Sequence, residues 1–233
     1  MGLQRGEGFV LRARPFAESD LILTVFTEGW GKRSLIAKGA RRFDSPLGGV
    51  FDLLNQVEVV FYPRARMDLA SQGALLCGFS ELKRDLEAVS SALVVARVLD
   101  SLLAPHQQER GAYLLFGRLL ALLERKAVPH DRMRLAATLK ILSLCGHRPH
   151  LTTCVACGRA SGPFAFSCER GGVLCAVCAA GDEVAMSRGL ALALDTLGRL
   201  PLDRAGVVAF SQAETAQAGE VLSSYVGRCA SGS

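Results

Sequence analysis

The chain has 233 residues, of which 50% are hydrophobic, and it carries a formal net charge of +5. This length allows one large domain or two to three small ones, with enough apolar residues for a core. No transmembrane helix is expected, because the longest apolar stretches (residues 92–104 and 112–123) fall short of about 18–20 residues; eight cysteines without a signal-peptide pattern favour a reducing cytoplasm.

The first 80 residues predict a small β-barrel. Short runs rich in β-branched and aromatic residues occur at residues 9–13, 21–27, 32–38, 57–62 and 69–76. Polar residues alternate with apolar ones in several of these runs, which is the period of a sheet with one wet face. Five short strands with an insertion at residues 39–55, between the third and the fourth, favour a barrel of the oligonucleotide-binding (OB) type over residues 1–80.

Positive charge gathers in the same part of the chain. Residues 30–66 hold seven basic side chains against three acidic ones, whereas residues 151–233 hold six against seven. Basic side chains neutralise phosphates and release counterions, and aromatic residues such as Trp30, Phe43 and Tyr62 can stack on bases. The alternative for any one of these residues is a solvated arginine or a core aromatic ring. The candidate nucleic-acid-binding residues are Arg12, Arg14, Lys32, Arg33, Lys38, Arg41, Arg42, Arg64 and Arg66.

From about residue 81 the apolar residues follow a helical period. Helices are expected at about residues 82–102, 111–126, 131–144, 186–200 and 209–229. Asp131 is the expected N-cap of the third helix, and residues 230–233 are expected to be a disordered tail. The fold class is therefore α+β, with the barrel followed by a helical domain over residues 81–233.

A cysteine-rich loop interrupts this helical domain at residues 151–180. Cys154 and Cys157 form one Cys-x-x-Cys knuckle, and Cys175 and Cys178 form a second. Two such knuckles at this separation predict one zinc ion, because four thiolates can reach its tetrahedral corners. Gly158 suits the tight turn after the first knuckle. Turn signals around residues 164–166 predict a short hairpin that brings the knuckles together.

The predicted zinc site is structural, because four thiolates leave no open position for a reacting water. Disulfides would need an oxidising compartment, and a redox Cys-x-x-Cys would need a thioredoxin-like context; neither is indicated. Cys168 lies inside the loop at the wrong spacing for a knuckle and is interpreted as a spare thiol.

No pattern of residues indicates catalysis. The sequence has no Walker-type phosphate loop, no His-Glu-x-x-His, no Gly-x-Ser-x-Gly and no deaminase His-x-Glu. Its carboxylates lack the paired, apolar setting that acid–base chemistry needs. We therefore expect a binding protein, not an enzyme.

Three segments resemble the RecO family, the bacterial recombination mediators of DNA repair. They are residues 10–23, residues 26–32, and residues 37–42 with the downstream Ser45 and Gly48-Gly49. The most specific part is Lys38-Gly-Ala-Arg-Arg42 with the following serine. The similarity covers nearly the whole chain, and the four cysteines occupy the place of the family's zinc loop.

The resemblance implies a protein that binds single- and double-stranded DNA through its barrel. Such proteins anneal strands coated with single-strand-binding protein (SSB) and, with the partner RecR, promote loading of the RecA filament. They act in the cytoplasm, at the nucleoid during repair. Their helical domain receives the acidic C-terminal tail of SSB, for which the candidate residues here are Arg125, Lys126, Arg132 and Arg134.

Two other functions remain open on the residues alone. One is a nucleic-acid processing enzyme with an unrecognised carboxylate site. The other is a zinc-stapled protein adaptor whose barrel has no intrinsic DNA activity. The basic residues of 30–66 argue against the adaptor, and the missing catalytic pattern argues against the enzyme.

Overall fold

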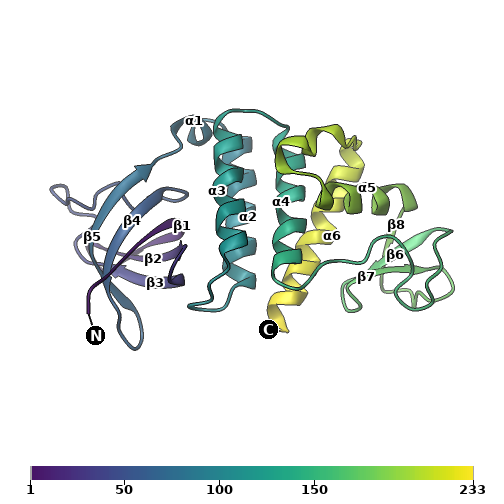
Figure 1. The fold of residues 1–233 in the computed structure, drawn as a ribbon, viewed down its shortest axis with the longest axis horizontal. Coiled ribbons are helices and arrows are strands. Elements are labelled where there is room, and N and C mark those ends of the chain that lie inside the picture. The colour runs from purple at the N-terminus through teal and green to yellow at the C-terminus, as the bar shows by residue number, and fades with distance from the viewer. Residues whose placement is uncertain (1, 233) are drawn as a thin grey trace. The chain divides into compact units, whose positions relative to one another are not determined.

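The structure of the protein, a computed structural model, describes residues 2–232 and consists of two compact units, Met1–Glu124 and Arg125–Ser233 (Figure 1). Within the described residues, none of the helices combines the length and the apolar character that crossing a membrane requires. Each unit is described separately below.

The first unit begins with the five-stranded closed barrel that the sequence predicts. The strands are β1 (Gln4–Phe16), β2 (Asp20–Thr27), β3 (Gly31–Ala37), β4 (Gln56–Tyr62) and β5 (Asp68–Cys77). They pair in the order β1-β2-β3-β5-β4, and every pair is antiparallel except β3 with β5. All five predicted runs are therefore strands, and the insertion at residues 39–55 connects the third to the fourth.

Alternate residues of the strands fill the barrel. Leu23, Val25 and Leu35 are fully buried there, as are Val57 and Phe61. The insertion also contributes a core residue, because Phe51 lies against Gly73 of β5, where a Cβ atom would come within 2.6 Å of the Phe51 ring. The glycine is therefore required by close packing, and the insertion is anchored on the barrel by its own aromatic residue.

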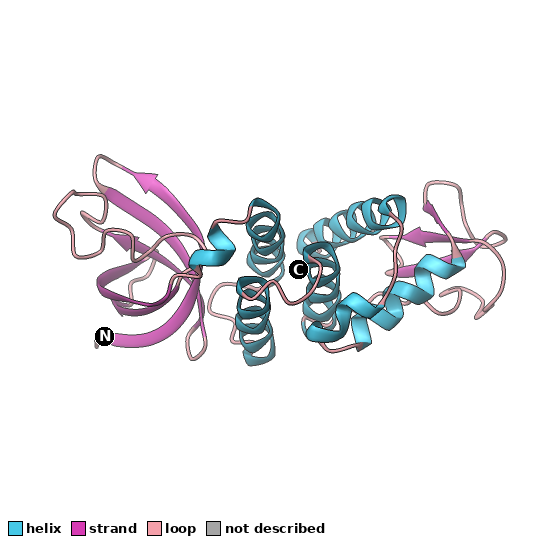
Figure 2. Cartoon of the chain, turned by 90° about the horizontal axis from the view of Figure 1, so that it is seen from above, coloured by secondary structure: helices cyan, strands magenta, loops and turns pink. Residues whose placement is uncertain are grey.

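Helices cover part of the outside of the barrel within the same unit (Figure 2). They are α1 (Ser80–Lys83), α2 (Leu86–Leu102) and α3 (Arg110–Glu124). Phe9 of β1 packs on Tyr113 and Phe116 of α3, with ring centroids 5.0 Å and 5.4 Å apart, and Phe26 of β2 lies 5.9 Å from Tyr113. The barrel thus has a second apolar core on its outer surface, which α3 completes.

The second unit combines helices with a small sheet. Its elements are α4 (His130–Leu144), β6 (Phe164–Ser167), β7 (Gly172–Cys175), β8 (Val184–Met186), α5 (Arg188–Arg199), η1 (Leu202–Val207) and α6 (Gln212–Ser231). Strands β6 and β7 form the predicted hairpin of the cysteine-rich loop, and β8, which the sequence analysis missed, pairs with β6. Tyr225 of α6 packs on Phe166 of β6 at 5.5 Å between ring centroids.

Two local predictions for this unit were wrong. Asp131 is not an N-cap: α4 begins at His130 after Pro129, and Asp131 lies in the first turn, paired with Arg132. Pro129 occupies the N-cap position with φ −52° and ψ 130°, so Asp131 lies inside the helix and not before it. Residues 230 and 231 are not disordered, because α6 continues to Ser231 with Tyr225, Val226 and Cys229 on its buried face. Ser233 lies outside the described residues.

The contacts within the chain place α1–α3 with the barrel, in the unit Met1–Glu124. The aromatic cluster between β1, β2 and α3 gives the physical reason. The sequence predicts separate folding domains at residues 1–80 and 81–233, with the loop of residues 151–180 inserted in the second. This division stays a prediction.

Candidate metal centre and basic surface

The four cysteines of the two knuckles converge on one point in the second unit. The Sγ atoms of Cys154, Cys157, Cys175 and Cys178 all lie within 4.8 Å of one another, and those of Cys157 and Cys175 are 3.7 Å apart. A tetrahedral ion with metal–sulfur bonds of about 2.3 Å separates its sulfurs by about 3.8 Å. The cluster therefore has the dimensions of a four-thiolate metal site.

The backbone of both knuckles turns tightly and closes on itself by N–H···O=C hydrogen bonds. Gly158 follows the first knuckle with φ +74° and donates its N–H to the Cys154 carbonyl at 2.8 Å. In the second knuckle, the Cys178 N–H donates to the Cys175 carbonyl at 2.9 Å. A left-handed φ is the conformation that glycine adopts without strain, so the sequence expectation for Gly158 is confirmed.

The ionisation of the thiols follows from this backbone and from their mutual proximity. Burial raises the pKa of Cys154, but hydrogen bonds from the N–H groups of Cys175, Ala156 and Cys157 outweigh it and lower that pKa to about 6. Hydrogen bonds with Cys157 and Cys175, together with burial, raise the pKa of Cys178 to about 12. Like charges resist ionising together, so all four thiols can be thiolates at the same time only when a cation neutralises them.

The donor set favours a soft, tetrahedral metal ion. Among the described residues, this is the one group of three or more histidine, cysteine or acidic side chains whose ligand atoms lie close enough to share an ion. Cys168, the predicted spare thiol, is outside the group.

A β-bulge in the first unit decides where the arginines of β1 point. Val10 pairs with Val25 and Arg12 with Thr24, so Leu11 is an extra residue in the ladder. Regular alternation from Val10, which lies in the core, would direct Arg12 into the barrel. The extra residue reverses the alternation, and Arg12 is exposed.

The outer face of β1, β2 and β3 consequently carries a set of basic residues. Arg12 pairs with Thr24, which pairs with Ser34, and Arg14 lies one cross-strand row further, beside Ile22 and Ile36. Lys32 lies near the start of β3 with the same parity as Ser34, and Lys38 is the first residue after the end of β3. We call these four basic residues, Arg12, Arg14, Lys32 and Lys38, the barrel face.

The acidic side chain of Asp100 forms ion pairs with two residues of the barrel face. Asp100 of α2 forms ion pairs with Arg12 and Lys32, each at 3.3 Å, and its carbonyl accepts a hydrogen bond from Lys32. Lys32 is therefore partly buried by an interaction within the unit, whereas Arg14 and Lys38 are exposed.

Arg33 does not belong to the exposed surface. Its side chain points into the barrel, where Nη2 lies 2.6 Å from Asp68 Oδ2 and the guanidinium lies 5.3 Å from the centroid of the Phe61 ring. Both charged groups are buried. The signal in the sequence is parity: Arg33 alternates with Lys32 and Ser34, so it faces the opposite side of the strand.

The insertion adds two exposed arginines next to Lys38. The Arg41 N–H donates to the Ser19 carbonyl at 2.8 Å, and the Gly39 N–H donates to Asp20 Oδ1 at 2.8 Å. These bonds tie the start of the insertion to the turn between β1 and β2. The side chains of Arg41 and Arg42 remain exposed.

The other candidates lie in the connection between β4 and β5. Arg64 and Arg66 are exposed, and the Arg64 N–H donates to Asp68 Oδ1 at 3.0 Å. Of the aromatic candidates, Phe43 is exposed and Tyr62 is 44% exposed. Trp30 packs within the barrel: its Nε1–H donates a hydrogen bond to the Arg5 carbonyl at 3.1 Å, and its ring contacts the Phe61 ring edge to face.

The sequence analysis missed one basic residue that the fold places beside this surface. Arg97 of α2 is exposed and lines a groove of about 590 Å³ together with Arg12 and Arg14. Helical spacing alone marked α2 as a core helix. The signal that could have revealed the groove is a second face of α2. Residues spaced by four, seven and eight positions share that face, namely Leu93, Arg97, Asp100 and Ser101.

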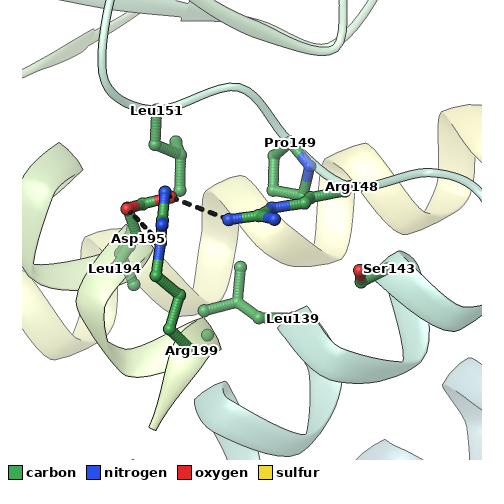
Figure 3. A pocket seen from close by; sticks show the side chains of 9 residues that line it. Leu139, Ser143, Arg148, Pro149, Leu151, Leu194, Asp195 and Arg199 are labelled. Carbon is green, nitrogen blue, oxygen red and sulfur yellow. Dashed lines mark hydrogen bonds and ion pairs between the residues drawn. The ribbon is translucent and has the colours of Figure 1, made fainter.

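The second unit contains a small pocket of about 130 Å³ between α4, α5 and residues 148–151 (Figure 3). Leu139, Leu151 and Leu194 line it, and the guanidinium groups of Arg148 and Arg199 share Asp195. Arg148 Nη2 lies 3.3 Å from Asp195 Oδ1, and Arg199 Nε lies 2.8 Å from Asp195 Oδ2. The pocket therefore offers an apolar wall beside two arginines that share one carboxylate.

Arg132, one of the candidates for the SSB tail, has a role within its own unit. Its guanidinium donates to the carbonyls of Val208 and Phe210 at 3.2 Å and 2.9 Å and to the Thr215 hydroxyl at 2.9 Å. It also lies 4.9 Å from the centroid of the Phe210 ring. Arg132 thus ties α4 to the segment before α6. Arg134 is partly buried, and Arg125 and Lys126 are exposed.

Comparison with known families gives matches over almost the whole chain. The family model "Recombination protein O N terminal" matches residues 1–79, and "Recombination protein O C terminal" matches residues 83–228.

Individual relatives agree with these models. The DNA repair protein RecO of Symbiobacterium thermophilum is 31% identical over 233 residues, which cover 97% of this chain and 92% of the relative. The DNA repair protein RecO of Roseiflexus sp. is 30% identical over 227 residues, covering 95% and 79%. That of Bifidobacterium longum is 34% identical over 178 residues, covering 75% and 74%.

Proposed function

The chain belongs to the RecO family of DNA repair proteins, and on that premise we propose that it is a DNA-binding recombination mediator without catalytic activity. It binds single- and double-stranded DNA and anneals complementary strands coated with SSB. The observation that carries the proposal is the barrel face, where a bulge turns Arg12 and Arg14 to the same outer surface as Lys32 and Lys38.

The DNA-binding surface in this proposal comprises eight of the nine basic residues that the sequence predicts, seven of them exposed and Lys32 partly buried. They are Arg12, Arg14, Lys32, Lys38, Arg41, Arg42, Arg64 and Arg66. Arg33 is left out, because its charge is neutralised by Asp68 inside the barrel. Phosphate contacts of this kind give affinity that is independent of sequence and steeply dependent on salt.

Annealing by such a surface requires no covalent step. A basic face that holds two strands at once lowers their mutual repulsion and raises the concentration of each strand at the other. Bases then pair by their own chemistry. The protein supplies proximity and charge neutralisation.

The proposed protein partners follow from the family. With RecR, the protein promotes RecA loading, and its second unit receives the acidic C-terminal tail of SSB. The pocket beside Leu139 and Leu194 fits such a tail, because Arg148 and Arg199 can meet carboxylates next to an apolar wall. This pocket takes the place of the four candidates from the sequence, Arg125, Lys126, Arg132 and Arg134, as the proposed tail site. The cytoplasm, at the nucleoid during repair, is the proposed location.

We also propose that the four cysteines bind one structural Zn²⁺ ion. The separation of 3.7 Å between two of the sulfurs fits a tetrahedral zinc ion, and the closed set of four thiols supports a structural site over a catalytic one. When bound, the ion would hold the two knuckles together and thereby the β6–β7 hairpin. The family models, which match residues 1–79 and 83–228, support a barrel domain at 1–80 and a helical domain at 81–233.

The first experiment measures annealing of complementary oligonucleotides, bare and SSB-coated, with and without the protein. The proposal expects acceleration that needs no nucleotide and persists on coated strands. No acceleration by folded, metal-loaded protein, together with negligible DNA binding at low salt, would favour the protein adaptor. Cleavage of labelled DNA in magnesium would instead indicate an enzyme.

A triple variant tests the surface. Lys38, Arg41 and Arg42 are exposed and adjacent, so changing all three to Ala should weaken DNA binding and lower the slope of log affinity against log salt by about 2, at about 0.7 per lost contact with single-stranded DNA. Fluorescence anisotropy across a salt series measures both. An unchanged slope would remove these residues from the surface.

Metal analysis of freshly purified protein tests the zinc site. One equivalent of zinc per chain is expected, and Cys157→Ser should lower it because three thiolates and a hydroxyl bind zinc less tightly. Cys168→Ser is the matched control, since Cys168 lies outside the cluster. Full zinc content in the Cys157 variant, or none in the wild type, would contradict the site.

A further inference from the structure

A groove of about 590 Å³ lies between β1 and α2 in the first unit. Residues 11–14 of β1 line one side of it, and Leu93, Arg97, Asp100 and Ser101 of α2 line the other, with Leu53 from the insertion. The four helix residues lie at intervals of four, seven and eight, so they share one face of α2. The bulge at Leu11 turns Arg12 and Arg14 towards this space.

The groove is electropositive. Three arginines, Arg12, Arg14 and Arg97, face one carboxylate, that of Asp100. Asp100 is already shared between Arg12 and Lys32. Within residues 2–232, Arg14 and Arg97 have no ion-pair partner within 4.0 Å, so their charges are available to an anionic ligand.

Between the charges the groove is apolar. Leu11 is buried at its base, Leu93 is partly buried, and Leu53 is 38% exposed. A polymer with phosphates along one edge and unstacked bases along the other matches this pattern of arginines beside leucines. Duplex DNA keeps its base faces stacked inside, so it can use the arginines but not the apolar lining.

The groove is also continuous with the barrel face. A second groove, of about 220 Å³, is lined by Arg12 and Arg14 together with Ile22, Thr24, Ser34 and Met67. The same two arginines therefore belong to both grooves. A strand held on the barrel face would continue into the groove beside α2 without a break in positive charge.

We propose that single-stranded DNA binds in the groove between β1 and α2, with Arg97 as a phosphate ligand and Leu53 and Leu93 beside the bases. This inference rests on the proposed DNA-binding function and extends it from the barrel to a helix. Asp100 opposes the binding, because its carboxylate occupies Arg12 and Lys32, which an incoming phosphate would otherwise contact.

The test compares single-stranded and duplex oligonucleotides of equal length by fluorescence anisotropy across a salt series. Arg97→Ala should weaken single-strand binding several-fold and lower the salt slope by about 0.7, one phosphate contact. Arg97→Lys should restore most of the slope. Asp100→Asn should strengthen binding, because it releases Arg12 and Lys32. Arg118→Ala is the matched control, an exposed arginine on the neighbouring helix α3 that lines neither groove.

The outcomes distinguish a failure of the proposed groove from a failure of the DNA-binding function on which it rests. If Arg97→Ala behaves like Arg118→Ala while the Lys38, Arg41 and Arg42 triple variant loses affinity, the groove is overturned and the DNA-binding function stands. If the wild type binds no DNA at low salt, both are overturned. Leu53→Ser adds a readout independent of charge, with weaker binding of single strands but not of duplex expected.

Discussion

Arg33 illustrates, at the scale of a single residue, how strand parity separates a structural arginine from a binding one. Its Nε atom donates to Asp68 Oδ2 at 2.7 Å and its guanidinium lies over Phe61, inside the barrel. Its neighbours Lys32 and Ser34 face outward. Basic residues at adjacent positions therefore face the core in one case and the surface in the other.

Replacing Arg33 with Met should destabilise the barrel by about 3–5 kcal/mol, because it leaves the carboxylate of Asp68 buried and unpaired. Urea denaturation followed by the fluorescence of Trp30, the single tryptophan of the chain, measures this in the barrel. Arg66→Met, at an exposed arginine, should change stability by no more than about 0.5 kcal/mol.

A double variant identifies the cause. Arg33→Met combined with Asp68→Leu should recover much of the lost stability, since the unpaired buried charge is then gone. Equal stability of the Arg33 and Arg66 variants would contradict the buried pair.

At the scale of elements, the way a strand or loop is built into the fold decides where its side chains point, and short sequence patterns do not always predict this direction. The bulge at Leu11 reverses the alternation of β1, and the insertion is anchored on the barrel by Phe51. Helix α6 begins at a capping box formed by Ser211 and Glu214 and continues as far as Ser231.

The capping box predicts a pH dependence for the start of α6. The Ser211 N–H and hydroxyl each donate to Glu214 Oε2 at 2.8 Å. These two bonds lower the pKa of Glu214 below its usual value, and the bond from the backbone N–H has the larger effect. A carboxyl whose pKa is lower in the folded state stabilises above its unfolded pKa, and this stabilisation is lost as the pH falls through its folded pKa.

Hydrogen exchange at the first turn of α6, corrected for intrinsic rates, measures the effect. Protection in the wild type should decrease as the pH falls from neutral into the acidic range. Glu214→Gln should show weaker protection at neutral pH and a flatter dependence, because its amide does not titrate. Glu220→Gln, at an exposed position further along the helix, is the control. Parallel profiles for wild type and Glu214→Gln would contradict the role of the cap.

At the scale of the whole molecule, the boundary between units differs from the boundary between family models. The models meet between residues 79 and 83, whereas the contacts of the chain divide it between Glu124 and Arg125. The outer face of the barrel explains the difference, because Phe9 and Phe26 are buried there against α3.

Truncation should distinguish the two boundaries. A fragment of residues 1–124 should unfold cooperatively near the stability of the barrel in the full chain. A fragment of residues 1–80 should be less stable and prone to self-association, because Phe9 and Phe26 become exposed. Urea denaturation and light scattering measure both properties. Equal stability and solubility of the two fragments would show that the barrel folds without its helices.

The sequence by itself determined those features that depend on neighbouring residues. Strand and helix periods predicted the barrel and the helical region, and the two Cys-x-x-Cys knuckles predicted the cluster of four thiols that the fold assembles. These patterns suffice because a period of two or of 3.6, and the reach of two cysteines in one turn, are local properties of the backbone.

Only the tertiary structure decided which charged side chains remain available at the surface. The bulge at Leu11 exposed Arg12, the pairing of β3 with β5 brought Arg33 to Asp68, and the packing of α2 placed Arg97 beside the barrel. Each of these depends on residues that are distant in sequence. Because a register shift of one residue moves a side chain to the opposite face, local patterns predict the strand, and they predict the direction of its charges only where no bulge intervenes.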